Sequence, residues 1–88
     1  MKIIKRDGKI VNFEENKIHQ SILSAAKDAN FSLTESDLSI LTSSVKDGIN
    51  FICNENRIPS SLEVRLLVFE TLIDNGFKKV ADAYIDVR

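Results

Sequence analysis

The chain has 88 residues, of which 43% are apolar and 28% charged, and its net charge at neutral pH is −1. This size and composition predict one small globular domain over residues 1–88, and the nearly neutral charge excludes a general nucleic-acid binder, which needs a strongly basic surface. One cysteine and one histidine exclude an internal disulfide and a zinc site, and the lack of a signal peptide or a membrane-length apolar run indicates a cytoplasmic protein.

The first element expected along the chain is a β-hairpin. Residues Lys2–Arg6 and Lys9–Phe13 are rich in strand-forming side chains, and Asp7-Gly8 separates them. An Asp-Gly pair between two such runs favours a two-residue type I′ turn, because both positions of that turn need a positive φ angle. In the register set by that turn, Ile4 faces Val11 across the hairpin.

Helices are expected over most of the remaining chain. Three pairs of capping residues mark helix starts: Asn12/Glu15, Thr34/Asp37 and Ser60/Glu63. The helices that follow them run to about Asn30, over roughly residues 35–55, and to a C-cap at Asn75-Gly76. A last helix covers roughly Lys78–Arg88.

Apolar side chains at helical spacing predict the buried face of each helix. In chain order these stripes are Ile18, Ile22, Ala25 or Ala26 and Ala29; Leu38, Leu41, Val45, Ile49 or Gly48 and Ile52; Leu62, Leu66, Phe69 and Ile73; and Val80, Ala81, Tyr84 and Val87. An isolated hairpin is marginal in water, so it must pack on the helices, with the first helix as its expected cover. The fold class is therefore α+β and mostly α, an N-terminal β-hairpin packed on a bundle of about four helices.

The hairpin end gathers positive charge. Residues 1–20 carry five Lys or Arg against three acids, and Lys5, Arg6 and Lys17 lie near one another and near a helix start. Cations beside the free N–H groups of a helix suit a small polyanion. Ile3 and Ile18 offer an apolar bed for a base. The alternative is that these cations are solvated and protect an edge strand, and no phosphate loop of the P-loop type is present.

No set of residues has the pattern of a catalytic centre. Glu14 and Glu15 are adjacent, so they lie on different helix faces and are better suited to a helix N-terminus than to acid–base work. His19 is expected on the surface and Cys53 at the edge of the core, and no signature supports a nucleophile pair between them. The sequence therefore predicts a domain that catalyses nothing and holds no metal through its own side chains.

Three ordered segments resemble one known family. Lys-Arg-Asp-Gly at residues 5–8, followed by Phe13, Lys17-Ile18 and Ala25-Ala26, is similar to the start of the ATP-cone domain. Ile58–Val64 and Ala81–Arg88 are similar to its later segments, so the resemblance covers essentially the whole chain. ATP-cones are regulatory modules of ribonucleotide reductases and of a repressor of their genes. They bind ATP or dATP and convert that occupancy into a change of oligomeric state.

The resemblance implies a nucleotide site. Lys5, Arg6 and Lys17 would contact phosphates, with Mg²⁺ accompanying them, and Ile3 and Ile18 would border the adenine. Ser60, at the start of the third helix, would lie near the nucleotide. The expected function is allosteric sensing of ATP or dATP that regulates a ribonucleotide reductase or related protein.

The expected partners are adenine nucleotides, a second copy of the chain or the catalytic domain of a reductase, and neither a membrane nor nucleic acid. The chain has neither the zinc-ribbon cysteines of the repressor members nor the catalytic barrel of the reductases, so neither DNA binding nor catalysis is expected in it. Two alternatives remain open: a protein-interaction module that uses the hairpin edge, and a nucleotide-sensing piece of a DNA-binding repressor.

Overall fold

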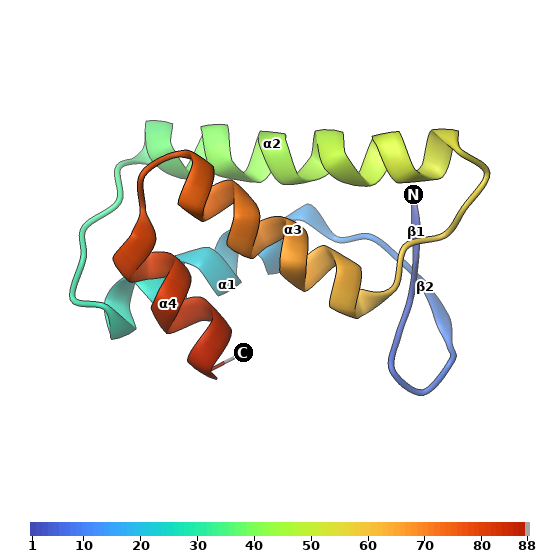
Figure 1. Ribbon diagram of the computed structural model, residues 1–88, viewed down its shortest axis with the longest axis horizontal. Helices are drawn as coiled ribbons and strands as arrows, with labels where there is room; N and C mark the ends of the chain where they lie inside the picture. The colour runs from blue at the N-terminus through green and yellow to red at the C-terminus, as the bar shows by residue number, and fades with distance from the viewer. Residues whose placement is uncertain (88) are drawn as a thin grey trace.

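A computed structural model describes residues 1–87, and it confirms an N-terminal hairpin followed by four helices (Figure 1). The elements in chain order are β1 (Lys2–Ile4), β2 (Ile10–Asn12), α1 (Glu15–Asp28), α2 (Glu35–Asn54), α3 (Ser61–Asp74) and α4 (Lys78–Val87). The last helix is predicted to end at Arg88, which lies outside the described residues. Its apolar stripe is predicted to end at Val87, whose side chain is not among those described. Within the described residues no helix is both long and apolar enough to cross a membrane.

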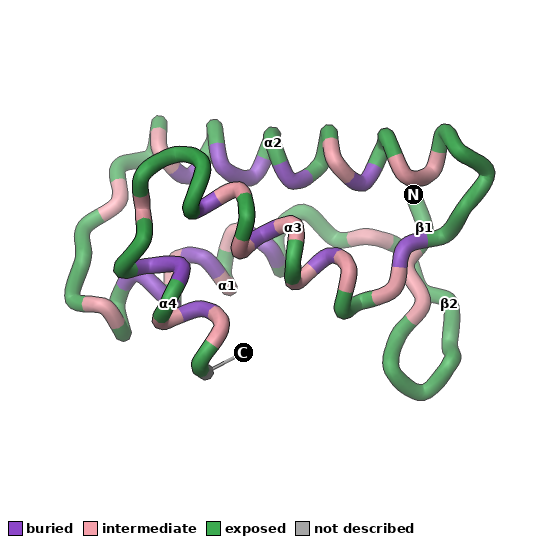
Figure 2. The backbone as a smooth tube through the Cα atoms, in the orientation of Figure 1, coloured by how far each residue is buried: buried purple, intermediate pink, exposed green. Residues whose placement is uncertain are grey.

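The core lies between the helices. α1 packs against α2 and α4, and α3 packs against the same two helices. The faces that the four helices turn toward one another carry the buried residues, whereas the hairpin turn is exposed (Figure 2). The predicted stripes of α1, α2 and α4 are confirmed except at Ala29 and Ile52, which are only partly buried. Their buried residues are Ile18, Ile22, Ala25, Ala26, Leu38, Leu41, Val45, Ile49, Val80, Ala81 and Tyr84. The starts of α1 and α3 both lie beside the hairpin, since Lys17, Ile18 and Ser61 line one hollow together with Ile3.

The predicted buried face of α3 is wrong. Val64, Val68 and Leu72 are the buried residues of this helix. Of the four predicted positions, Phe69 is partly buried, and Leu62, Leu66 and Ile73 are exposed. Apolar side chains surround nearly the whole of α3, so two stripes satisfy the helical period equally well, and packing against α2 and α4 selects one of them.

The hairpin forms, but its predicted turn and register are wrong. Ile4 pairs with Ile10 and Ile3 with Val11, one residue away from the expected register. The turn is a three-residue loop, in which the Gly8 N–H donates to the Lys5 carbonyl at 2.9 Å and only Gly8 has a positive φ angle, of 86°. This register places Ile3 and Val11 side by side on one face of the ribbon.

The hairpin is attached to the segment that precedes α3. The Ile4 N–H donates to the Pro59 carbonyl at 3.0 Å, and Ile4 forms a parallel bridge with Ser60. Ile3 and Phe13 pack partly against the helical core. The outer edge of β1 is thus occupied by residues 59–60, and the start of α3 is fixed beside the hairpin.

The predicted capping box at Asn12 and Glu15 is also wrong. Helix α1 begins at Glu15 with Glu14 as its N-cap, and Glu14 makes no side-chain capping hydrogen bond. Asn12 belongs to β2, where its Oδ1 accepts a 2.6 Å hydrogen bond from the Lys2 ammonium across the hairpin. Asn12 therefore pairs with Lys2 in the hairpin and does not act as the N-cap of α1.

Candidate functional site

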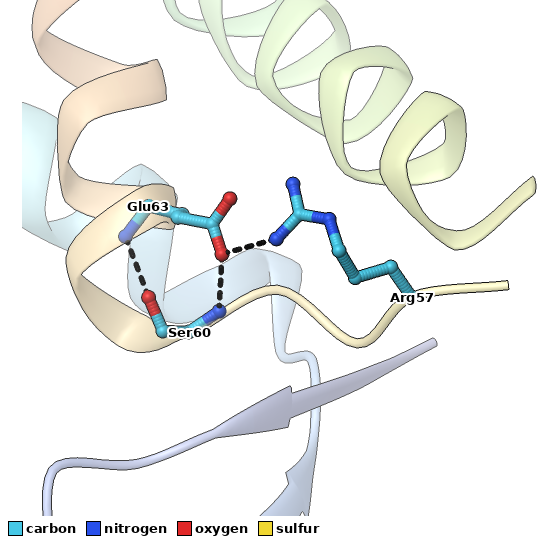
Figure 3. A network of polar contacts seen from close by, with 3 residues as sticks. All are labelled: Arg57, Ser60 and Glu63. Carbon is cyan, nitrogen blue, oxygen red and sulfur yellow. Dashed lines mark hydrogen bonds and ion pairs between the residues drawn. The ribbon is translucent and has the colours of Figure 1, made fainter. Parts of the chain in front are cut away.

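A capping box fixes the start of α3, as the sequence predicts. The Glu63 N–H donates to Ser60 Oγ, and the Ser60 N–H donates to Glu63 Oε1, both at 3.1 Å. Arg57 joins the box from the preceding loop, with its Nη1 2.7 Å from the same carboxylate oxygen (Figure 3). Three residues therefore hold the backbone at the point where it meets β1.

The contacts of the capping box also keep Glu63 ionised. The hydrogen bond from Arg57, followed by that from the Ser60 backbone N–H, lowers the pKa of Glu63 from 4.5 to about 2. The same hydrogen bond from Arg57 raises the pKa of the guanidinium. Because Arg57 and Glu63 neutralise each other, this ion pair adds no net charge to the surroundings of the hairpin.

The hairpin turn presents two cations. Asp7 Oδ1 accepts from the Lys9 N–H at 3.1 Å and so stabilises the three-residue loop from inside. The side chains of Lys5 and Arg6 form no hydrogen bond or ion pair with other residues of the 1–87 range. Their charges are therefore available to a ligand, because no carboxylate of the described chain neutralises them.

A hollow of about 660 Å³ lies between the hairpin end and the helices. We call it the cationic hollow, because Lys5, Arg6 and Arg65 line it. Ser60, Ser61 and Tyr84 add hydroxyl groups, and its lining includes no carboxylate. Its volume lies within the ~300–1,000 Å³ typical of small-molecule sites, and its charge favours an anion.

A second hollow of about 450 Å³ lies on the other side of Lys5. We call it the apolar hollow, because Ile3, Val11, Phe13 and Ile18 line it. Lys17 and Glu14 lie at it as an ion pair, with Lys17 Nζ 2.9 Å from Glu14 Oε2. The two hollows share Lys5 and Ser61, so a ligand with an anionic part and a flat apolar part has an adjoining place for each.

The six predicted site residues divide between the two hollows. Lys5, Arg6 and Ser60 line the cationic hollow, and Ile3, Lys17 and Ile18 line the apolar one together with Lys5. Lys17 differs from the expectation in being paired with Glu14. Both side chains are more than half exposed, and such exposed pairs contribute only about 0–1 kcal/mol, so an anion can displace Glu14 at small cost.

Sequence reasoning missed Arg65. Its Nη2 donates to the Ile85 carbonyl in the last turn of α4 at 3.0 Å. Its buried Nε has no hydrogen-bond partner among residues 1–87. The signal available in the sequence is the spacing of Ser61 and Arg65, which lie four residues apart and hence on the same face of α3.

The described residues contain no group of three or more His, Cys, Asp or Glu side chains that is placed to hold a metal ion. His19 and Cys53 line neither the cationic nor the apolar hollow. Cys53 packs partly against the core, as expected for a residue at its edge. The two hollows therefore offer charge, hydroxyl groups and apolar surface, which serve binding.

Comparison with protein families agrees with this geometry. The model of the ATP cone domain matches residues 1–88, the whole chain. A comparison with curated proteins finds no match. The chain therefore belongs to the ATP-cone family, whose members are regulatory domains that bind ATP or dATP.

Proposed function

We propose that this domain senses ATP and dATP at the two adjoining hollows and thereby regulates a ribonucleotide reductase or a related protein. The observation that carries the proposal is the shared position of Lys5, which borders both a cationic and an apolar hollow. A nucleoside triphosphate has the same two-part character. One ligand can therefore fill both hollows at once.

The cationic hollow is the proposed phosphate site. Lys5 and Arg6 contact the phosphates, and Arg6 grips two oxygens where a lysine provides a point charge. Lys17 approaches from α1 after exchanging Glu14 for a phosphate oxygen, and Ser60 lies near the nucleotide at the start of α3. Mg²⁺ would enter with the phosphates, which themselves supply its oxygen ligands.

The apolar hollow is the proposed adenine site. Ile3 and Ile18 border the base, and the observed register adds Val11 beside Ile3. Discrimination between ATP and dATP rests on a single ribose hydroxyl, which one hydrogen bond recognises with about 0.5–1.5 kcal/mol. We therefore expect the two nucleotides to differ in affinity by no more than roughly tenfold.

Regulation requires that occupancy changes what the domain presents to a partner. Leu62 lines the cationic hollow and is also 63% exposed, and Leu66 and Ile73 continue its exposed apolar face along α3. A nucleotide beside Leu62 thus lies next to a surface suited to another protein. The proposed response is a change in self-association or in docking to a reductase catalytic domain.

Calorimetric titration with ATP, dATP and GTP tests nucleotide sensing. We expect micromolar binding of the adenine nucleotides and weaker binding of GTP. Sedimentation with and without each nucleotide then tests whether occupancy changes the oligomeric state. A folded chain that binds no nucleotide at millimolar concentration would overturn the proposal and favour an interaction module. Retention on DNA at physiological salt would favour a repressor fragment.

The interaction module has less support in the structure. The Ile4 N–H on the outer edge of β1 already donates to Pro59, so strand addition is left to the outer edge of β2, which is only three residues long. We therefore keep that function as an outcome of the titration and not as a second candidate.

A further inference from the structure

We propose that Arg65 is a third phosphate-binding residue of the cationic hollow. This inference rests on the proposed nucleotide function and deepens it. Arg65 lies on α3, far in sequence from the hairpin, and lines the same hollow as Lys5 and Arg6. It completes a set of three cations around a space whose lining has no carboxylate.

The Arg65 guanidinium is already oriented. One of its five N–H donors is used by the Ile85 carbonyl, which is among the last carbonyls of α4 that lack a helical partner. This contact fixes the group between α3 and α4. A charged side chain held in place loses less conformational freedom when it binds than a mobile surface lysine does.

The Arg65 guanidinium also has donors to spare. Nη1 makes no hydrogen bond among the residues described, and Nη2 uses only one of its two N–H groups for the Ile85 carbonyl. Nε is buried and also lacks an acceptor there, so it can reach a ligand only after a shift of the side chain. An arginine can hold phosphate through two N–H groups at once, and Nη1 and Nη2 supply them here.

Phosphate binding also fits the way in which the cations near the hairpin are paired with carboxylates or left unpaired. Arg57, the nearest arginine along the chain, is neutralised by Glu63, whereas Arg65 faces no carboxylate in the hollow that it lines. Lys17 at the apolar hollow is paired with Glu14. Of the four cations that line the two hollows, Lys5, Arg6 and Arg65 have no carboxylate partner among the residues described, whereas Lys17 must first release Glu14.

A purely structural role for Arg65 is the alternative, since its contact with Ile85 by itself stabilises the end of α4. Binding of ATP and of AMP separates the two roles. A phosphate-binding residue affects the triphosphate more than the monophosphate, whereas a structural residue affects both equally or affects only folding.

The experiment compares wild type with Arg65→Ala, Arg65→Lys and the control Lys79→Ala. The control removes one exposed positive charge from a residue that lines neither hollow. We expect Arg65→Ala to weaken ATP binding about 10- to 30-fold while AMP affinity changes less than threefold. Arg65→Lys should recover part of the loss, and Lys79→Ala should change ATP affinity less than twofold.

Circular dichroism establishes whether each variant is folded. If Arg65→Ala does not fold, the ATP and AMP affinities of Arg65→Lys test the assignment instead. Unchanged ATP affinity in the folded Arg65 variants, or equal losses for ATP and AMP, would overturn the assignment of Arg65 alone. Absence of ATP binding by the wild type would overturn the proposed function and, with it, this inference.

Discussion

At the scale of single residues, the hairpin end is positioned by its backbone. The loop at residues 6–8 is closed by hydrogen bonds from Gly8 to Lys5 and from Lys9 to Asp7, so the side chains of Lys5 and Arg6 take no part in holding it. A change at either side chain should therefore alter binding without altering the fold.

Replacing both Lys5 and Arg6 by alanine should weaken ATP binding by about 3–4 kcal/mol, since each charge-assisted contact contributes about 1.5–2 kcal/mol. Titration calorimetry at constant ionic strength measures this loss, because salt alone changes phosphate affinity. The melting temperature without nucleotide should stay nearly constant. Lys9→Ala is the matched control, since Lys9 lies on the same hairpin and lines neither hollow. Normal ATP binding by the double variant would contradict the site.

Glu63 should make stability depend on pH in the acid range. Its folded pKa of about 2 lies below the ordinary 4.5, so the contribution of the ion is complete above pH 4.5 and is lost as the pH falls toward 2. The carboxylate is partly exposed to solvent, so we expect a loss of only about 1 kcal/mol, the size of a capping or exposed ion-pair contribution.

Urea unfolding at pH 6 and pH 2.5 measures the contribution of Glu63. Glu63→Gln keeps an oxygen that can accept from the Ser60 N–H but has no charge to lose, so its unfolding free energy should fall less with acid than that of wild type. Glu70→Gln, a change at an exposed carboxylate of the same helix, serves as the control. Equal acid sensitivity of Glu63→Gln and wild type would refute the role of this carboxylate.

At the scale of elements, α3 has one apolar face in the core and another in solvent. Leu72 is fully buried, whereas Leu66 is 45% exposed. The same substitution, leucine to alanine, therefore tests the two faces. Leu72→Ala should cost about 3 kcal/mol of unfolding free energy, because it removes packed methyl groups and leaves a cavity. Leu66→Ala should cost about 0.5 kcal/mol or less. Similar costs in urea unfolding would show that the faces are assigned incorrectly.

Gly8 and Gly76 permit a second matched test. Both have a left-handed backbone, with φ angles of 86° and 87°, and a Cβ at either position would meet no atom within 4 Å. Alanine at each should therefore cost about 1 kcal/mol through backbone strain alone. Only Gly8 lies in the hairpin turn, so only Gly8→Ala should weaken ATP binding, by roughly fivefold. If calorimetry gave the two variants equal affinities for ATP, the conformation of the hairpin turn would not contribute to ATP binding.

Most features that the sequence predicts correctly have local contacts. The capping boxes at Thr34/Asp37 and Ser60/Glu63 each join residues three positions apart, and both are confirmed. The equally local box at Asn12/Glu15 is not, because Asn12 pairs with Lys2 across the hairpin. The hairpin register was mistaken because an Asp-Gly pair fits both a two-residue turn and the three-residue loop observed. The buried face of α3 depends on α2 and α4, which no pattern within α3 specifies.

The same distinction holds for the candidate site. Lys5 and Arg6 belong to one short motif, and the hairpin alone brings them together. Arg65 reaches the cationic hollow only because its helix packs on α4, where it contacts Ile85 twenty residues away. A residue placed by tertiary packing gives little signal in its own neighbourhood, which is why the sequence did not indicate it.

At the scale of the whole molecule, the two hollows lie where the hairpin meets the helices. Few contacts hold the hairpin there, chiefly the Ile4–Pro59 hydrogen bond and the partly buried Ile3 and Phe13. A ligand that contacts Lys5 on the hairpin and Ser61 on α3 would tie the two parts together. Nucleotide binding should therefore stabilise the attachment of the hairpin more than it changes the helical core.

Saturating ATP should raise the free energy of unfolding, by about 2.7 kcal/mol at a hundred times the dissociation constant. Hydrogen exchange locates the effect. The amides of Ile4 and Gly8 should be protected in the hairpin by more than the global increase, if they exchange by local opening without nucleotide. Buried amides such as that of Val45 should slow only by the global factor. GTP at the same concentration is the control for charge. If the amides of Ile4 and Gly8 exchange faster than the core without nucleotide, ATP protection of these amides by no more than the global factor would contradict a site at the junction of hairpin and core.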